Sequence, residues 1–126
     1  MTHNEYVPGV CNIGGDEIER RRKVGWVSLA ITLALFAALK AAGFDSWWRL
    51  LVFFPAALSA SGFLQALFRF CSGFGRAGLY NFAALGETHR VDDEPSKAKD
   101  KTKAYQLILY SVCIGGVVAI IAKVLD

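Results

Sequence analysis

Four consecutive cations at residues 20–23 are followed at once by an uncharged apolar run over residues 24–39. A basic block beside a long apolar segment is typical of a membrane-spanning helix whose basic flank stays in the cytoplasm. Hydrophobic residues make up 54% of the 126 residues, which exceeds the roughly 45–50% of soluble domains even though that figure also counts glycine. We therefore expect a small integral membrane protein.

The first predicted span covers residues 24–42 and follows a cytoplasmic lead over residues 1–23. Asp16 and Glu19 predict that the helix begins before the membrane, with Asp16 as N-cap and Glu19 reaching back in a capping-box arrangement. A cleaved signal peptide is an alternative, because small residues follow the apolar run at 41–43. The polar lead is long, however, and the run exceeds the usual length of roughly 7–15 residues. We therefore expect the helix to be retained.

The second and third predicted spans cover residues 47–70 and 104–125. Pro55 lies inside the second span and could kink it, which a membrane helix tolerates when a neighbour pairs the released carbonyl. Small residues four positions apart let helix backbones approach closely. Two such pairs predict a packing face on the second span: Ala56 with Ala60, and Gly62 with Ala66.

Residues 71–103 separate these two spans and return the chain to the cytoplasmic side. The part over residues 73–85 is too apolar for a free loop and too short and glycine-rich to cross, so we predict an interfacial or re-entrant segment. A charged linker follows. The predicted fold is all-α, a single-domain integral membrane three-helix bundle with this segment after the second span.

Three spans would place the N-terminus in the cytoplasm and the C-terminus outside. This arrangement leaves 11 of the 14 Lys and Arg residues cytoplasmic, as the positive-inside rule requires. If the third segment failed to cross, both termini would lie inside. We expect a multi-pass protein of the cytoplasmic (inner) membrane.

Glycines 73, 75 and 78 match the spacing of a dinucleotide-binding fingerprint. That fingerprint requires a buried strand before it and a helix after it in a βαβ unit. Here the glycines follow a membrane span, so we interpret them as turn and packing residues.

The topology brings Cys11 and Cys71 to the same side of the membrane, together with His3 and His89. These residues show no CxxC or HxxxH spacing, so structural thiols are expected. A redox or metal role and S-acylation are the alternatives. Cys113, inside the third span, is interpreted as a small buried apolar residue.

A cytoplasmic cap is predicted where the start of the first helix packs on residues 76–81, with Glu17 or Glu19 pairing with Arg76. Its candidate residues are Cys11, Asn12, Glu19, Cys71, Arg76, Tyr80 and Asn81.

Polar side chains inside the spans fall at a common depth. The Gln65 amide is the most informative, because facing lipid would leave its donors and acceptor unpaired. We expect an interhelical hydrogen-bond layer, worth about 0.6–2 kcal/mol per contact. Its candidate residues are Ser28, Thr32, Ser61, Gln65 and Ser111.

The sequence assigns no catalytic, cofactor-binding or metal-binding residue, because it has no Ser/His/Asp arrangement, no paired carboxylates facing the membrane and no phosphate loop. We expect a non-catalytic structural, assembly or accessory subunit that uses no cofactor. Its expected partners are membrane lipid and a protein partner or second copy, and not nucleic acid. Two alternatives are a redox- or metal-linked membrane protein using Cys11 and Cys71, and an oligomeric small-solute channel or transporter lined by Ser59, Ser61 and Gln65.

Overall fold

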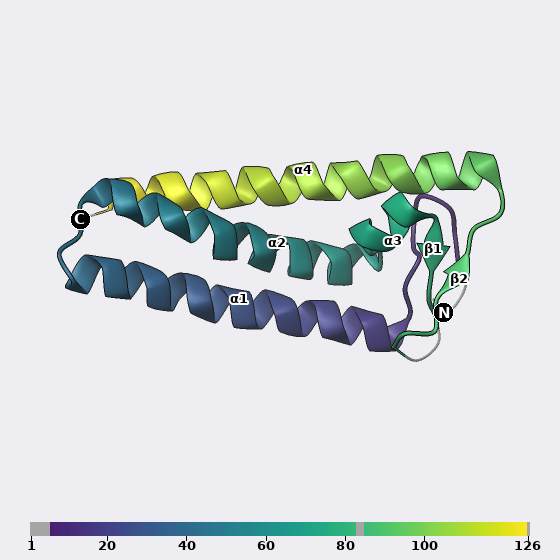
Figure 1. The fold of residues 1–126 in the computed structure, drawn as a ribbon, viewed down its shortest axis with the longest axis horizontal. Coiled ribbons are helices and arrows are strands. Elements are labelled where there is room, and N and C mark those ends of the chain that lie inside the picture. Colours follow the sequence, from purple (N-terminus) through teal and green to yellow (C-terminus); the bar gives the residue numbers. More distant parts are fainter. Residues whose placement is uncertain (1–5, 83–84, 126) are drawn as a thin grey trace.

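The computed structural model of the chain describes residues 6–82 and 85–125. It is mostly helical, with helices α1 (Gly15–Ala41), α2 (Phe53–Phe68), α3 (Ser72–Ala77) and α4 (Glu94–Val124), a 3₁₀ helix (Ser46–Val52), and strands β1 (Leu79–Tyr80) and β2 (His89–Arg90). The three long helices run side by side, and α2 lies between α1 and α4 (Figure 1).

Three helical segments are long and apolar enough to cross a membrane: Gly15–Ala41, Ser46–Phe68 and Glu94–Val124. Their outward faces carry large apolar side chains such as Ile31, Leu58 and Ile120, which are exposed in the isolated chain. Hydrocarbon is the solvent that such faces require, and helices satisfy their own backbone groups within it. These features indicate a multi-pass membrane protein.

Helices α1 and α2 approach each other closely at Gly25 and Gly62. A Cβ atom on Gly62 would lie 2.6 Å from the Gly25 nitrogen and 2.7 Å from the Arg21 carbonyl oxygen. The hydroxyl of Ser59 donates to the Gly25 carbonyl oxygen at 2.7 Å. The small residues predicted as a packing face, Ala56, Ala60, Gly62 and Ala66, are all buried. The face therefore serves packing within this chain.

Pro55 does not interrupt α2, although the predicted span over residues 47–70 places it inside a helix. The α-helix begins at Phe53, after the 3₁₀ helix, so Pro55 lies in its first turn. Backbone N–H groups in a first turn lack helical partners, so a proline there removes no hydrogen bond from the helix.

The start of α1 differs from the predicted capping box. Gly14 is the N-cap and makes no side-chain cap hydrogen bond, while Asp16 and Glu19 are exposed. Gly14 also donates its N–H to the Asn81 carbonyl oxygen at 2.8 Å. A Cβ atom at Gly14 would lie 2.9 Å from the Phe82 backbone, so the approach of these two segments requires glycine at the cap.

Helix α4 begins ten residues before the predicted third span. Its N-cap is Asp93, whose carboxylate accepts from the Ser96 N–H at 3.2 Å, and a proline occupies the first turn. An aspartate cap followed by a first-turn proline is a strong helix start. The part of the linker that follows Asp93 is therefore helical and continuous with the apolar part of α4.

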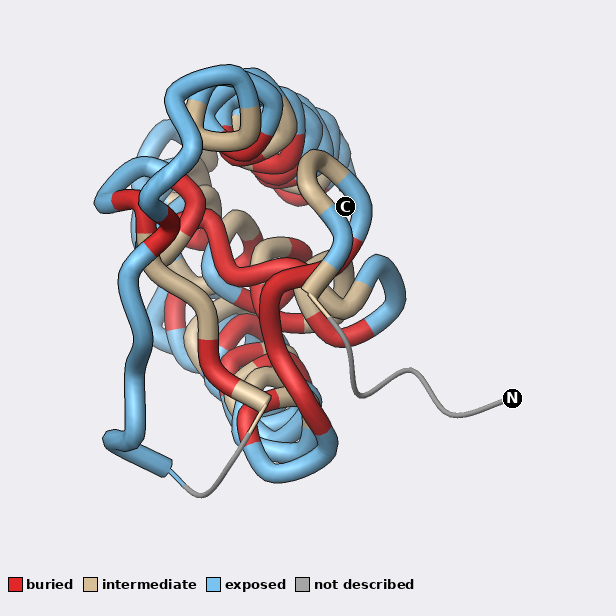
Figure 2. Tube along the Cα trace, turned by 90° about the vertical axis from the view of Figure 1, so that its right-hand side faces the viewer, coloured by how far each residue is buried: buried red, intermediate tan, exposed pale blue. Residues whose placement is uncertain are grey.

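The segment predicted as interfacial or re-entrant forms α3 and β1 at the end where α1 begins (Figure 1). Strand β1 pairs antiparallel with β2, Leu79 opposite Arg90 and Tyr80 opposite His89. Seen from this end, buried residues follow the connecting segments as well as the inner sides of the helices (Figure 2). Ala83 and Ala84 of the predicted segment lie outside the described residues.

Candidate functional site

Five polar or ionisable side chains gather where α1 begins and α2 ends. Asn12 precedes α1, Glu17 and Arg21 lie in its first two turns, Cys71 links α2 to α3, and Asn81 follows β1. The exposed fraction is 0% for Asn12 and Asn81, 1% for Glu17 and 5% for Cys71. We refer to these five residues as the cap cluster.

Asn12 fastens the N-terminal segment to the link between α2 and α3. Its side-chain amide donates to the Cys71 carbonyl oxygen at 3.2 Å and accepts from the Cys71 N–H at 2.7 Å. Its backbone N–H donates to the carbonyl oxygen of Arg69 at 3.0 Å. Arg69 ends α2 in a left-handed conformation with φ of 53°, which turns the chain toward Asn12. The backbone of Cys71 is therefore held on both of its hydrogen-bonding groups.

Arg21 joins α1 to the same link through its side chain. Its Nη2 donates to the Cys71 sulfur at 2.8 Å, and its Nη1 forms an ion pair with Glu17, one turn earlier on α1. The guanidinium carbon also lies 5.5 Å from the centre of the Phe74 ring. Only 14% of the Arg21 side chain is exposed. The guanidinium is thus enclosed between a carboxylate, a sulfur and an aromatic face.

Glu17 is the buried anion of the cluster. One carboxylate oxygen pairs with Arg21, and the other accepts from the Asn81 side chain at 3.1 Å. A buried charge is tolerated when it is both paired and hydrogen-bonded. Removing Arg21 would leave the Glu17 charge uncompensated, and removing Asn81 would take away the hydrogen bond to its other carboxylate oxygen.

Cys71 is buried, and its sulfur neighbours the exposed Gly73, on which a Cβ atom would lie 3.7 Å from that sulfur. Cys11 is also buried and immediately precedes Asn12. All three cysteines of the chain are present as thiols. The interpretation of Cys113 as a buried residue is wrong: it is exposed, because it lies off the buried face of α4 that includes Ser111 and Gly115.

The predicted cap residues are partly brought together. Asn12, Cys71 and Asn81 belong to the cap cluster, and Cys11 is adjacent to it. Tyr80 is half-buried and stacks on Tyr6 at a centroid distance of 4.8 Å. Glu19 and Arg76 are exposed. The predicted pairing with Arg76 is wrong for Glu17, which pairs with Arg21 because the two lie one turn apart on one helix.

Arg21 and Asp100 were not among the predicted cap residues. The spacing of Glu17 and Arg21 could have indicated their pair, whereas nothing local marks Asp100, which is fully buried. Its carboxylate accepts from the Tyr6 hydroxyl, and from the Gly9 N–H at 2.8 Å. Burial, and then the hydrogen bond to Asp100, raise the pKa of Tyr6 above its usual range. This contact ties the N-terminal segment to α4.

The polar residues within the spans differ from the predicted interhelical layer. Thr32 and Ser111 donate to the carbonyl oxygens of Ser28 and Leu107, four residues earlier on their own helices. Hydroxyl side chains in helices commonly bond in this way. The Gln65 amide donates to the Ser61 hydroxyl at 2.9 Å and accepts from the N–H of Ser72 at 2.9 Å, at the start of α3. Two other side chains donate between spanning segments: Ser59 to the Gly25 carbonyl oxygen of α1, as described above, and Arg49 to the Ala122 carbonyl oxygen of α4 at 3.3 Å.

Among the described residues, no group of three or more His, Cys, Asp or Glu side chains could hold a metal ion. His89 lies beside the Tyr80 ring at 5.5 Å between centroids. His3 lies outside the described residues.

Compared with protein-family models, curated proteins and solved structures, the chain shows no match.

Proposed function

We propose that this chain is a redox-responsive thiol protein of the membrane, in which Cys71 reacts first and Cys11 second. The observation that carries the proposal is the contact between the Arg21 guanidinium and the Cys71 sulfur at 2.8 Å. The thiolate is the nucleophilic form of cysteine, and a neighbouring arginine stabilises negative charge on sulfur. A purely structural buried thiol would not require a cation beside it.

The remaining members of the cap cluster support this assignment. Burying a guanidinium is costly unless its charge is balanced, and Glu17 balances it while Asn81 orients Glu17. Asn12 fixes the backbone of Cys71 from the other side. The sulfur is thereby held in one position relative to the guanidinium.

Hydrogen peroxide is the oxidant class that fits a thiol enclosed this closely, because it is small. The Cys71 thiol gives up its proton as its sulfur attacks one peroxide oxygen, the O–O bond breaks, and the leaving oxygen takes up that proton and departs as water. The resulting sulfenic acid is then attacked by the Cys11 sulfur, the S–O bond breaks, and a second water leaves. Two thiols thus lose two electrons and two protons and form one disulfide. In the cytoplasm such disulfides are transient and suit sensing.

The test is the rate at which each cysteine is oxidised in the folded, reduced protein in detergent micelles. Peroxide is added, the reaction is stopped with an alkylating reagent, and cysteine peptides are quantified by mass spectrometry. We expect Cys71 to react faster than Cys113, and Cys11→Ser to arrest Cys71 as a trappable sulfenic acid. Arg21→Gln should slow Cys71 by about tenfold, the factor corresponding to about 1.4 kcal/mol.

Arg22→Gln is the matched control, because Arg22 is an exposed neighbour on the same helix. Arg21→Lys, which keeps the charge, should restore part of the rate. The proposal is overturned if Cys71 reacts no faster than Cys113. It is also overturned if Cys71 is oxidised at equal rates in Arg21→Gln and Arg22→Gln while both variants keep the wild-type melting temperature.

The second candidate is the non-catalytic accessory or assembly subunit expected from the sequence. It is favoured by the way the cap cluster joins the N-terminal segment, α1, the α2–α3 link and β1 into one fixed surface. In that case both thiols are inert in the folded protein, and serine or alanine at Cys71 leaves the protein's assembly in the membrane unchanged. The oxidation experiment therefore separates the two functions.

The same proposal places the cap cluster on the cytoplasmic side of an inner membrane, in a three-helix bundle whose C-terminus is outside. It is supported by the charge distribution, since 11 of the 14 Lys and Arg residues belong to the N-terminal lead and to residues 69–103. A reducing cytoplasm would return an oxidised pair to thiols, as a reversible sensor requires.

A further inference from the structure

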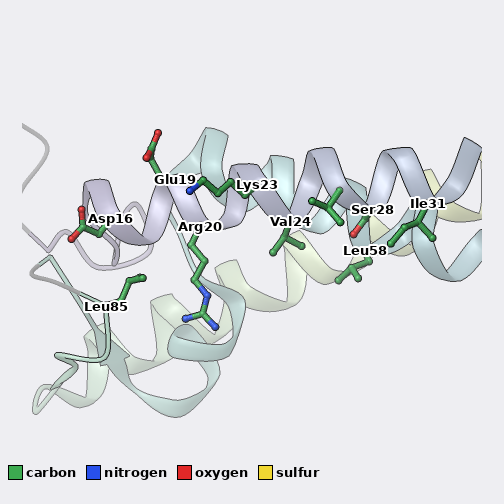
Figure 3. A pocket seen from close by; sticks show the side chains of 10 residues that line it. Asp16, Glu19, Arg20, Lys23, Val24, Ser28, Ile31, Leu58 and Leu85 are labelled. Atoms are coloured by element: carbon green, nitrogen blue, oxygen red, sulfur yellow. The ribbon is translucent and has the colours of Figure 1, made fainter.

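A groove of about 600 Å³ runs along the outer side of α1, from its cytoplasmic start into the apolar part of the helix. Its first part is lined by four charged side chains, Asp16, Glu19, Arg20 and Lys23, and the rest mainly by apolar ones, among them Val24, Ile31 and Leu58 (Figure 3). This groove shares no residue with the cap cluster.

The lining changes character in a fixed order along α1. The two acids come first, the two cations next, and then Val24, Val27 and Ile31. Spacings of three and four residues place these positions on one face of the helix. At a rise of about 1.5 Å per residue, each acid lies about 6 Å above the cation four positions later, and Ile31 lies about 12 Å below Lys23.

In the described chain, the four charged side chains of the groove form no ion pair with one another. Although Asp16 and Arg20, and Glu19 and Lys23, have the spacing of helix ion pairs, the ion pairs among the described residues are Arg21 with Glu17 and Lys97 with Glu94. Arg20 extends toward α2, away from the two carboxylates (Figure 3). The groove thus offers two unpaired anions and two unpaired cations at different depths.

We infer that this groove binds phosphatidylethanolamine. Arg20 and Lys23 take the phosphate, the ammonium group reaches Asp16 and Glu19 on the aqueous side, and an acyl chain lies along Val24, Ile31 and Leu58. Arginine and lysine are the side chains that hold phosphates. The order of ammonium, phosphate and acyl chain in this lipid, from water inward, is the order of acid, cation and apolar residue in the groove.

The balance of charge distinguishes this lipid from the two nearest alternatives. Phosphatidylglycerol would place its phosphate beside the two cations, but its headgroup carries no positive charge to place beside Asp16 and Glu19. Phosphatidylcholine carries a quaternary ammonium, which donates no hydrogen bond to a carboxylate. Only a primary ammonium supplies both charge and N–H donors at that depth.

Native mass spectrometry of the whole protein in detergent tests the inference, with the three lipids added in turn at equal concentration and with identical acyl chains. We expect phosphatidylethanolamine to bind at least about fivefold more tightly than either alternative, since it alone satisfies all four charges. The double variant Arg20→Gln/Lys23→Gln should lose binding of all three lipids. Asp16→Asn/Glu19→Gln should keep lipid binding but lose the preference for the ethanolamine headgroup.

Arg22→Gln is again the matched control, because Arg22 lies between the two cations in sequence but does not line the groove. The inference is overturned if phosphatidylglycerol binds as tightly as phosphatidylethanolamine, which would mean a simple anion site. Equal effects of Arg22→Gln and the Arg20/Lys23 double variant would also overturn it, since binding would then be that of bulk annular lipid. Circular dichroism of each variant verifies that α1 is intact.

Discussion

The guanidinium of Arg21 and the sulfur of Cys71 are 2.8 Å apart although 50 positions separate them in the sequence. The contact exists because the ion pair with Glu17 orients the Arg21 side chain, while Asn12 fixes the backbone of Cys71 by hydrogen bonds.

Glu17→Ala should destabilise the protein by about 2–4 kcal/mol, because it leaves Arg21 enclosed without its counter-ion and Asn81 without its acceptor. The measurement is thermal or denaturant unfolding in a fixed detergent. Glu19→Ala is the control, since Glu19 is exposed on the same helix, and its effect should stay within about 0.5 kcal/mol. Equal destabilisation by the two variants would show that the cap cluster contributes no net stability.

Gly62→Ala should push α1 and α2 apart, because its Cβ atom would lie 2.6 Å from the Gly25 nitrogen. We expect a loss of about 1–3 kcal/mol, the usual range for overpacking. Gly116→Ala is the matched control in α4, where a Cβ atom meets nothing within 4 Å. The control should be neutral or slightly stabilising, since alanine favours helix over glycine by up to about 1 kcal/mol. A neutral Gly62→Ala would contradict the packing between the two helices.

Alkaline pH should loosen the N-terminal segment through Tyr6. Its pKa is raised in the folded protein, so the folded state keeps a proton that the unfolded state loses above the ordinary value of about 10. The stabilisation is therefore complete below pH about 10 and is lost as pH rises toward the folded pKa. As the pH rises above about 10, the melting temperatures of the wild type and Tyr6→Phe should converge. Tyr105→Phe is the control, because Tyr105 is exposed, and its melting temperature should change with pH as that of the wild type does.

Reporter fusions test the proposed orientation. A fluorescent protein that matures only in the cytoplasm should be active at the N-terminus and inactive at the C-terminus, and an alkaline phosphatase should show the opposite pattern. Cytoplasmic activity at both ends would mean that α4 does not cross. That result would leave the cap cluster cytoplasmic but would remove the three-span topology.

The spans could be predicted because length and hydropathy are properties of contiguous residues. The basic block before residue 24 and the three apolar runs are visible without any tertiary information, and the structure has helices there. The buried small residues of α2 were equally visible, because their spacing of four is local.

The cap cluster could be predicted only in part, because its contacts join segments that are far apart in the sequence. Asn12 and Cys71 are 59 positions apart, and Glu17 and Asn81 are 64 apart. The capping box failed for a similar reason: Gly14 must meet the Phe82 backbone, and that requirement outweighs the local preference for Asp16. The polar layer failed because hydroxyl groups in helices have a nearer acceptor in their own backbone.

Helix α4 is a single uninterrupted rod of 31 residues, about 46 Å long at 1.5 Å per residue. Near its first turns, Asp100 holds the N-terminal segment through Tyr6 and Gly9. Near its last turn, carbonyl oxygens of Ala122 and Leu125 accept from Arg49. The helix is therefore hydrogen-bonded near both of its ends to segments that precede it in the sequence, and turning it about its axis would require breaking hydrogen bonds at both.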